Sequence, residues 1–303
     1  MYFQETVRET IEIMQAKLNN LFFVLLISIA AAVPAVIAGI AIYAGFYITF
    51  FVGVFSNGAL FAGPLGMALM ALLIIIGIAL TIGFIAYGAL AGTALNRMLY
   101  LTAGGQELPF STAKVNEIIA YAKENLVAYL KLNLVGTAPF IVFFIIWTIL
   151  AFAPMYVIGG AGGLPAIAIC FLLIIILALL AIPVLFALSS VYYTAIMLFF
   201  MENEKTGVFA MLSKSWSLFR SNLLEYALFM LGVSAISAMV LGFTYIIGII
   251  CFPLMMGYYM ASFAVQFGSI IAMFIFLGKI MGKKSISAAP KADKKKKIKK
   301  AEK

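Results

Sequence analysis

The sequence predicts an all-α integral membrane protein: a six-helix bundle of three repeats, each an in-plane amphipathic helix followed by a transmembrane hairpin. An ordinary soluble domain is excluded because 65% of the 303 residues are hydrophobic and only 10% are charged, against about 25% charged in soluble proteins. Residues 21–96, 132–201 and 226–278 contain no Asp, Glu, Lys or Arg. A helix of about 20 apolar residues crosses a bilayer, so each run has room for two spans and a turn.

The charged residues lie in four blocks that flank the apolar runs, at residues 5–17, 97–131, 202–225 and 279–303. Two spans in each run would place all four blocks on one face of the membrane, and loops rich in Lys and Arg lie on the cytoplasmic face. We therefore expect a multi-pass protein of the plasma membrane with both termini in the cytoplasm. The predicted spans are residues 21–44, 65–95, 132–157, 165–200, 225–246 and 252–278.

Two spans contain residues that affect helix geometry or packing. Division of the fourth span at Pro183 would give two short helices and move the third charged block to the other face. A single kinked helix is favoured, because bundles tolerate proline kinks. In the second span, Gly88 and Gly92 form a G-x-x-x-G pair, which predicts a close approach of another helix.

The first three charged blocks have the apolar periodicity of amphipathic helices. Apolar side chains recur every three or four positions, which places them on one helical face. Helices of this kind lie in the membrane surface with the apolar face down. The stripes are Val7, Ile11, Met14 and Leu18; Val115, Ile118, Ile119, Ala122, Leu126 and Tyr129; and Val208, Met211, Leu212, Leu218 and Phe219.

The three blocks also resemble one another where each leads into a span. Asn20, Asn125 and Asn222 each stand before a Leu at this junction, and Pro34 and Pro139 follow their Asn at equal distances. We interpret this as three copies of one unit within a single membrane domain, residues 1–280. The alternative is that any six-span protein with short cytoplasmic loops shows a similar layout. The predicted units are residues 1–96, 97–201 and 202–280.

The chain ends in a lysine-rich segment, residues 281–303, with very few apolar side chains. Such a composition predicts a disordered cytoplasmic tail. It could bind anionic lipid, at about 1 kcal/mol for each Lys near the surface, or serve only as a solvated tail that reinforces topology. Nucleic acid is an unlikely partner, because no aromatic residues are interleaved with the lysines.

A more specific motif lies in and before the third charged block. It consists of Ala195, Glu202, Gly207, Ala210, Ser215, Trp216, Leu218, Arg220 and Asn222. This pattern resembles the signature of a membrane family that includes the membrane domain found beside glycerophosphodiester phosphodiesterases and the YciC-type inner-membrane proteins. The resemblance covers about 30 residues closely, and the six-span layout extends it loosely to residues 1–280. It implies an integral membrane protein without assigned catalytic residues, and we expect no attached phosphodiesterase domain.

The motif also has a direct physical interpretation as a lipid-headgroup or interface site. Glu202 would lie near the start of a surface helix, where it can meet free backbone N–H groups or Arg220. Trp216 suits the headgroup layer, and the planar guanidinium of Arg220 can reach a lipid phosphate. Ser215 and Asn222 complete this candidate site. An anchor that orients the hairpin, a headgroup site and, least favoured, catalysis remain as alternatives.

A second candidate set is polar but uncharged and lies within the spans. It could line a transport pathway or form hydrogen bonds between helices. Transporters usually place ionisable residues at mid-membrane, and the predicted spans contain none at that depth. The set consists of Tyr192, Tyr193, Tyr258, Ser262 and Gln266.

The remaining chemistry argues against an enzyme. The chain has no His, and Cys170 and Cys251 lie in separate apolar runs, so we expect no metal, cofactor or disulfide. Nucleophile and phosphate-loop motifs are also missing from the sequence. We therefore expect a non-enzymatic protein that engages anionic lipid headgroups through its amphipathic helices and basic tail. The alternative is a permease or channel component for a small solute or lipid.

Overall fold

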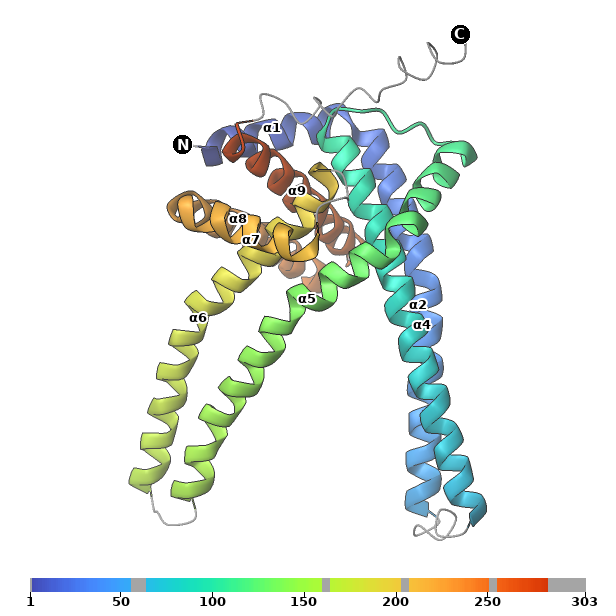
Figure 1. The fold of residues 1–303 in the computed structure, drawn as a ribbon, viewed down its shortest axis with the longest axis vertical. Coiled ribbons are helices and arrows are strands. Elements are labelled where there is room, and N and C mark those ends of the chain that lie inside the picture. Colours follow the sequence, from blue (N-terminus) through green and yellow to red (C-terminus); the bar gives the residue numbers. More distant parts are fainter. Residues whose placement is uncertain (1, 56–63, 160–163, 203–206, 251–254, 283–303) are drawn as a thin grey trace. The chain divides into compact units, whose positions relative to one another are not determined.

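The computed structural model describes residues 2–55, 64–159, 164–202, 207–250 and 255–282, and within these ranges all regular structure is helical (Figure 1). The predicted all-α fold is therefore confirmed for this part of the chain. The predicted tail lies outside it from residue 283 onward. The helices are α1 Tyr2–Ala16, α2 Leu18–Phe55, α4 Pro64–Ala103, α5 Thr112–Gly159, α6 Leu164–Met201, α7 Val208–Ser221, α8 Leu223–Ile250 and α9 Met255–Ile280.

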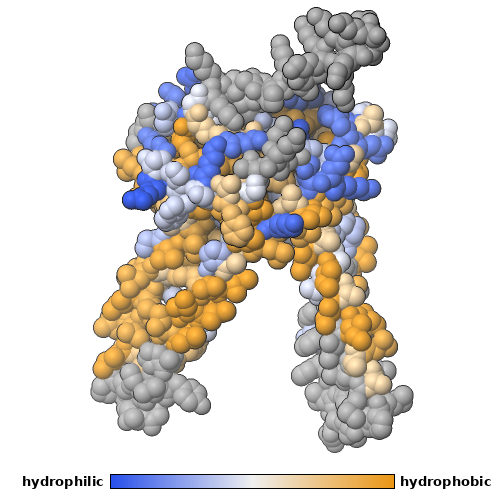
Figure 2. All heavy atoms as spheres, viewed as in Figure 1, coloured by the Kyte–Doolittle hydropathy of each residue, from blue (hydrophilic) through white to orange (hydrophobic). Residues whose placement is uncertain are grey.

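Several helices are long and apolar enough to cross a membrane. The described residues contain five such helices, or up to six if Tyr2–Ala16 and Leu18–Pro34 are counted together as one. Hydrophobic side chains cover the outward surface of the hairpin formed by α5 and α6 (Figure 2). Soluble proteins rarely expose so large an apolar surface to water, so this surface is that of an integral membrane protein. The five helices are Ile75–Ala103, Thr112–Phe152, Ala168–Met201, Leu223–Ile246 and Gly257–Ile280.

The helix boundaries agree with local sequence signals. The hydroxyl of Ser111 accepts a hydrogen bond from the backbone N–H of Lys114 at 3.2 Å, which caps the start of α5. Beyond the end of α4, Gly105 has a φ of 74°, and the N–H of Gln106 bonds back to the carbonyl of Leu101 at 3.0 Å. This is the Schellman arrangement, which favours glycine because other residues are strained at positive φ.

The chain divides into two compact units, one formed by residues 1–15, 103–105 and 128–303, and the other by residues 16–102 and 106–127. In the first unit, α6, α7, α8 and α9 pack around buried aromatic side chains. The rings of Phe229 and Phe276 stack with centroids 4.3 Å apart. Tyr226 packs edge-on against Phe276 at 5.1 Å, and its hydroxyl bonds with that of Thr194 at 3.0 Å. Aromatic packing therefore holds the span ends and the surface helix α7 together.

In the second unit, α2 and α4 lie side by side (Figure 1). The hydroxyl of Tyr87 on α4 donates to the carbonyl of Ala31 on α2 at 2.8 Å. Phe23 of α2 and Met98 of α4 are buried. The two helices form the hairpin expected from the first apolar run.

The chain differs in structure around the three asparagines that begin the predicted junctions. A turn at Lys17 separates α1 from α2, and Asn222 separates α7 from α8. In contrast, α5 continues through Asn125 without a break, so the predicted separate in-plane helix over the second block is wrong. α6 is one helix with Pro183 inside it, which agrees with the preferred single span. The three-repeat arrangement stays a prediction.

The G-x-x-x-G pair in α4 does not mark a close helix contact at its first glycine. A Cβ atom built on Gly88 would meet nothing within 4 Å. Close approaches occur elsewhere: a Cβ on Gly136 of α5 would stand 2.6 Å from the ring of Tyr192 on α6. Gly136, which lies outside the G-x-x-x-G pair, is therefore a position where the lack of a side chain admits a neighbouring ring.

Candidate functional site

The family-like motif lies on α7, a short helix with two distinct faces. Met211, Ser215 and Phe219 are buried, at the i, i+4 spacing of one helical face. A second stripe at helical spacing is exposed. It consists of Phe209, Ser213, Trp216 and Arg220.

The buried face fixes α7 to the neighbouring spans. The ring of Phe219 lies 5.5 Å from that of Tyr226 and 5.8 Å from that of Phe186. The Ser215 hydroxyl donates to the carbonyl of Met211 at 2.7 Å, which satisfies it within its own helix. Ser215 therefore belongs to the packed face and presents no free hydroxyl to a lipid headgroup.

The exposed stripe carries the two residues expected to meet the headgroup layer. Trp216 is 51% exposed, and its ring is 5.9 Å from that of Phe219, tilted by 37°. Arg220 is exposed, and within the described ranges no ion pair involves it. Because the opposite face is anchored, an apolar ring and a free cation project together from a fixed helix.

Glu202 pairs with a different cation from Arg220, the partner considered in the sequence analysis. Its carboxylate forms an ion pair with the ammonium group of Lys214 on α7. The pair links the end of α6 to the surface helix that follows it. Arg220 is thus left available, and the suggestion that Glu202 meets Arg220 is wrong for this structure.

Asn222 caps the end of α7. Its backbone N–H bonds to the carbonyls of Leu218 and Phe219 at 3.2 and 3.3 Å, and its side-chain amide donates to Leu218 at 3.0 Å. Its φ and ψ of −128° and 33° are not helical. Asn222 therefore has a structural role, since it ends α7 and starts the turn into α8.

The polar residues within the spans form two separate groups. Tyr192 of α6 donates to the Oδ1 atom of Asn133 on α5 at 2.5 Å, and its ring lies 5.7 Å from that of Tyr193. On α9, the ring of Tyr258 lies 5.7 Å from that of Tyr245 on α8. Ser262 is partly buried and Gln266 is exposed. In the chain as described, no hydrogen bond joins the α6 group to the α9 group.

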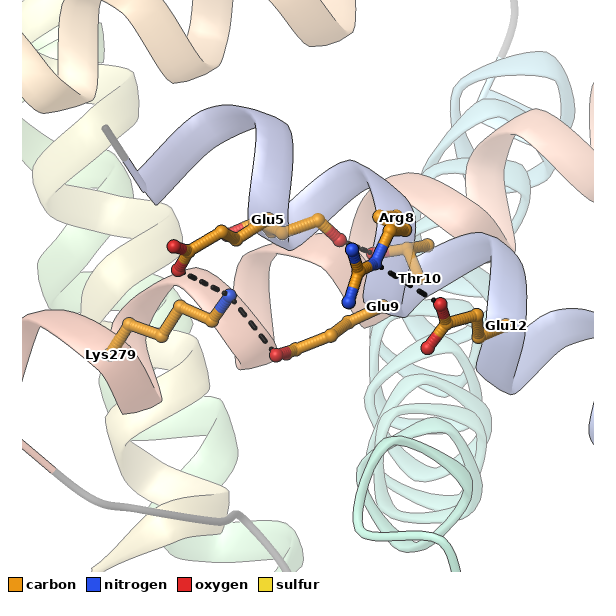
Figure 3. A network of polar contacts seen from close by, with 7 residues as sticks. Glu5, Arg8, Glu9, Thr10, Glu12 and Lys279 are labelled. Atoms are coloured by element: carbon orange, nitrogen blue, oxygen red, sulfur yellow. Dashed lines mark hydrogen bonds and ion pairs between the residues drawn. The ribbon is translucent and has the colours of Figure 1, made fainter.

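A polar network between α1 and α9 was not predicted from the sequence (Figure 3). The ammonium group of Lys279 lies 3.4 Å from a carboxylate oxygen of Glu5 and 3.2 Å from one of Glu9. On the same helix, Arg8 pairs with Glu12 at 3.2 Å. The i, i+4 spacing of Glu5 and Glu9 and the position of Lys279 at the end of the last apolar run were the available signals.

An apolar groove of about 420 Å³ lies between α1, α8 and α9. Its few hydroxyl groups include Thr10 and Ser269, which donate to Thr6 and Val265 of their own helices, both at 2.7 Å. Gly268 allows Met14 of α1 to approach α9, since a Cβ there would meet the Met14 sulfur at 3.1 Å. The groove therefore has an apolar lining.

Metal chemistry finds no support in this part of the chain. Over the described ranges, no group of three or more His, Cys, Asp or Glu residues could hold a metal ion. Cys170 is buried.

Comparison with known proteins gives no family for the chain. No protein-family model matches it. Neither the curated proteins nor the solved structures compared with it contain a match. The function must therefore be argued from the geometry alone.

Proposed function

We propose that the protein is a non-enzymatic integral membrane protein that engages anionic lipid headgroups at the cytoplasmic face. The observation that carries this proposal is the exposed stripe of α7, on a helix whose other face is buried. The stripe presents Trp216 beside Arg220, which forms no ion pair with the described residues. Tryptophan is favoured at the membrane–water interface, and guanidinium binds phosphate oxygens with two parallel hydrogen bonds. A fixed helix presents both groups without the entropy cost of ordering a loop.

The proposed topology has six spans, three repeats and both termini in the cytoplasm of a plasma-membrane protein. The helix bounds support two spans in each apolar run, and α1 and α7 are each a short helix followed by a long apolar one. The lysine-rich tail would then lie on the face that carries anionic lipid, where it adds to the attraction. The resemblance to the family with the α7 motif is part of the same proposal.

The alternative, a permease or channel component, has weaker support. Tyr192 is engaged with Asn133 in the hairpin formed by α5 and α6, as expected of a hydrogen bond that joins helices. Gln266 is the residue that best suits a pathway, because it is exposed on α9. Solute flux in proteoliposomes that falls in a Gln266→Leu variant would favour transport.

The headgroup proposal is tested with full-length protein in nanodiscs of mixed phosphatidylcholine and phosphatidylglycerol. Native mass spectrometry then measures the ratio of the two lipids that remain bound. The Trp216→Ala/Arg220→Ala variant is expected to lower the phosphatidylglycerol ratio about three- to fivefold, since a cation near an anionic surface contributes about 1 kcal/mol. An unchanged ratio would contradict the proposal.

A matched control comes from α5. Lys131→Ala/Phe144→Ala also removes one exposed cation and one half-exposed ring, but from a helix without the α7 stripe. This variant is expected to keep the wild-type lipid ratio. An equal loss in both variants would show a general charge effect and would remove α7 as the site.

A further inference from the structure

The second unit contains a recess beside the start of α2. Its volume is about 690 Å³, within the usual range of about 300 to 1,000 Å³ for small-molecule sites. One wall comes from Lys17 and the first turns of α2, and the other from residues 107–110. The residues that define its chemistry are Lys17, Glu107, Phe22, Leu26 and Phe110.

The second wall is held against α2 by specific contacts. The Asn20 side chain donates to the carbonyl of Gln106 at 2.7 Å and accepts from the N–H of Leu108 at 3.0 Å. The ring of Phe110 packs edge-on against Phe23 at 5.0 Å. The recess is therefore formed before any ligand binds, which lowers the cost of binding.

The recess has a polar side and an apolar side. On the polar side, the Lys17 ammonium lies 3.2 Å from the Glu107 carboxylate, and the two side chains are 20% and 86% exposed. On the apolar side, Phe22 and Phe110 are exposed although they are large hydrophobic residues. Exposed rings beside an ion pair with an exposed carboxylate indicate an amphiphilic ligand.

The residues that line the recess lie at a boundary in the sequence between a charged segment and an uncharged one. Lys17 ends the first charged block, and the uncharged run that contains Phe22 and Leu26 begins at Leu21. In a membrane protein, such a boundary lies where the headgroup layer meets the hydrocarbon. A lipid at this level would set its headgroup beside the charges and a chain beside the rings.

We propose that the recess binds a phospholipid with a phosphoethanolamine headgroup. The lipid phosphate accepts hydrogen bonds from the Lys17 ammonium, and the primary amine donates to the exposed carboxylate of Glu107. One acyl chain lies along Phe22, Leu26 and Phe110. The proposal does not rest on the α7 stripe, which belongs to the other unit and is assigned to anionic lipid.

The two charges select this headgroup over its common alternatives. A phosphoglycerol headgroup carries no cation, so Glu107 would face a net negative lipid without compensation. A phosphocholine headgroup carries a cation, but its quaternary ammonium has no N–H to donate to the carboxylate. Of the three headgroups, phosphoethanolamine alone satisfies both members of the ion pair with charge-assisted hydrogen bonds, since its phosphate accepts from Lys17 and its primary amine donates to Glu107.

The first experiment uses full-length protein in nanodiscs with equal amounts of phosphatidylethanolamine, phosphatidylcholine and phosphatidylglycerol of identical acyl chains. Native mass spectrometry measures which lipids remain bound. For the wild type, the ratio of ethanolamine to choline lipid is expected to be about fivefold, the equivalent of about 1 kcal/mol for an exposed charge pair. Glu107→Gln is expected to lower it to about one.

The matched control is Glu117→Gln. Glu117 forms a similar exposed pair with Lys114 at 2.8 Å in the same unit, and neither residue lines the recess. This variant is expected to keep the wild-type ratio. The Trp216→Ala/Arg220→Ala variant is also expected to keep it, so this proposal and the α7 proposal can fail separately. A wild-type ratio of ethanolamine to choline lipid near one, or an unchanged ratio in Glu107→Gln, overturns the proposal.

A second measurement needs no variant and so cannot be confounded by misfolding. Short-chain ethanolamine and choline phospholipids are added to the wild type, and amide hydrogen exchange is followed at residues 106–110. The ethanolamine lipid is expected to slow exchange there several-fold more than the choline lipid at the same concentration. Equal protection by both, or by neither, would overturn the assignment.

Discussion

Replacement of Asn20 by Leu tests the contact that shapes the second unit. Asn20 is buried, with only 3% of its surface exposed, and it bonds to both Gln106 and Leu108. Leu has a similar size but can neither donate nor accept. The variant therefore removes these bonds while it leaves the space largely filled.

The expected loss follows from which groups are left unpaired. The N–H of Leu108 is buried and would lose its acceptor, at a cost of about 1 to 3 kcal/mol. The carbonyl of Gln106 belongs to an exposed residue and can bind water instead, so its lost bond adds only about 1 kcal/mol. The Asn20 amide also donates to the Thr102 hydroxyl at 3.4 Å, and after the loss of this bond the hydroxyl keeps its own bond to the carbonyl of Met98. We expect the free energy of unfolding to fall by about 2 to 4 kcal/mol.

Two measurements check this value. Unfolding in mixed micelles of increasing SDS content gives the change in stability. Hydrogen exchange at Leu108 is expected to accelerate about 30-fold or more, because each 1.4 kcal/mol is a factor of ten in an equilibrium constant. The matched control is Asn125→Leu: Asn125 is also buried, but its amide bonds only to the carbonyl of Tyr121 one turn earlier in the same helix. If both variants lost the same stability, the argument from the orphaned amide would be refuted.

Two further predictions concern the first unit. Lys279→Gln removes the cation shared by two glutamates of α1. It is expected to lower the free energy of unfolding by only about 0.5 to 1 kcal/mol, because the glutamates are largely solvated. Proteolysis within α1 should become faster, whereas Arg8→Gln, which breaks a pair within α1 alone, should change the rate little. Gly136→Ala is expected to destabilise the protein by about 1 to 3 kcal/mol, because the added methyl group would overlap with the Tyr192 ring. Gly242→Ala, with open space around it, should stabilise the protein by about 0.5 to 1 kcal/mol. If unfolding in SDS showed the Gly242 variant to be the less stable of the two, the packing at Gly136 would be contradicted.

The helices could be predicted from the sequence because the bilayer constrains them strongly. Backbone groups in hydrocarbon must be paired within a helix, so an uncharged run of sufficient length specifies a helix almost regardless of its residues. This is why the predicted span 165–200 and the observed α6, Leu164–Met201, agree closely despite Pro183. On α7, two members of the predicted apolar stripe, Met211 and Phe219, are buried on one face, together with Ser215, which the apolar pattern does not include.

Partners of single side chains could not be predicted in the same way. Glu202 has both Lys214 and Arg220 on the following helix, and the choice between them depends on the rotation of α7 about its axis. That rotation is set by the packing of Phe219 against Tyr226 and Phe186. Burial of an aromatic face therefore decides which cation is neutralised and which one stays free.

The three asparagines at the predicted span junctions show that one local sequence pattern can take different structural roles. Asn125 and Asn222 both donate to the carbonyl four residues earlier, yet α5 continues through Asn125 while α7 ends at Asn222. Asn20 bonds instead to a segment more than 80 residues later in the chain. An Asn side chain can satisfy a helix end, a helix interior or a loop with the same two polar atoms.

The tertiary partner therefore decides which of these roles each asparagine takes. At Asn20 the partner is a segment that a Schellman turn at Gly105 directs back toward α2. No corresponding returning segment bonds to the side chain of Asn125 or Asn222 among the residues described. If the three predicted repeats do share an origin, the recess belongs, among the residues described, to the Asn20 junction alone. A ligand that binds there should accordingly occupy one site in each chain, so a lipid stoichiometry near one would agree with the assignment, and a stoichiometry near three would argue against it.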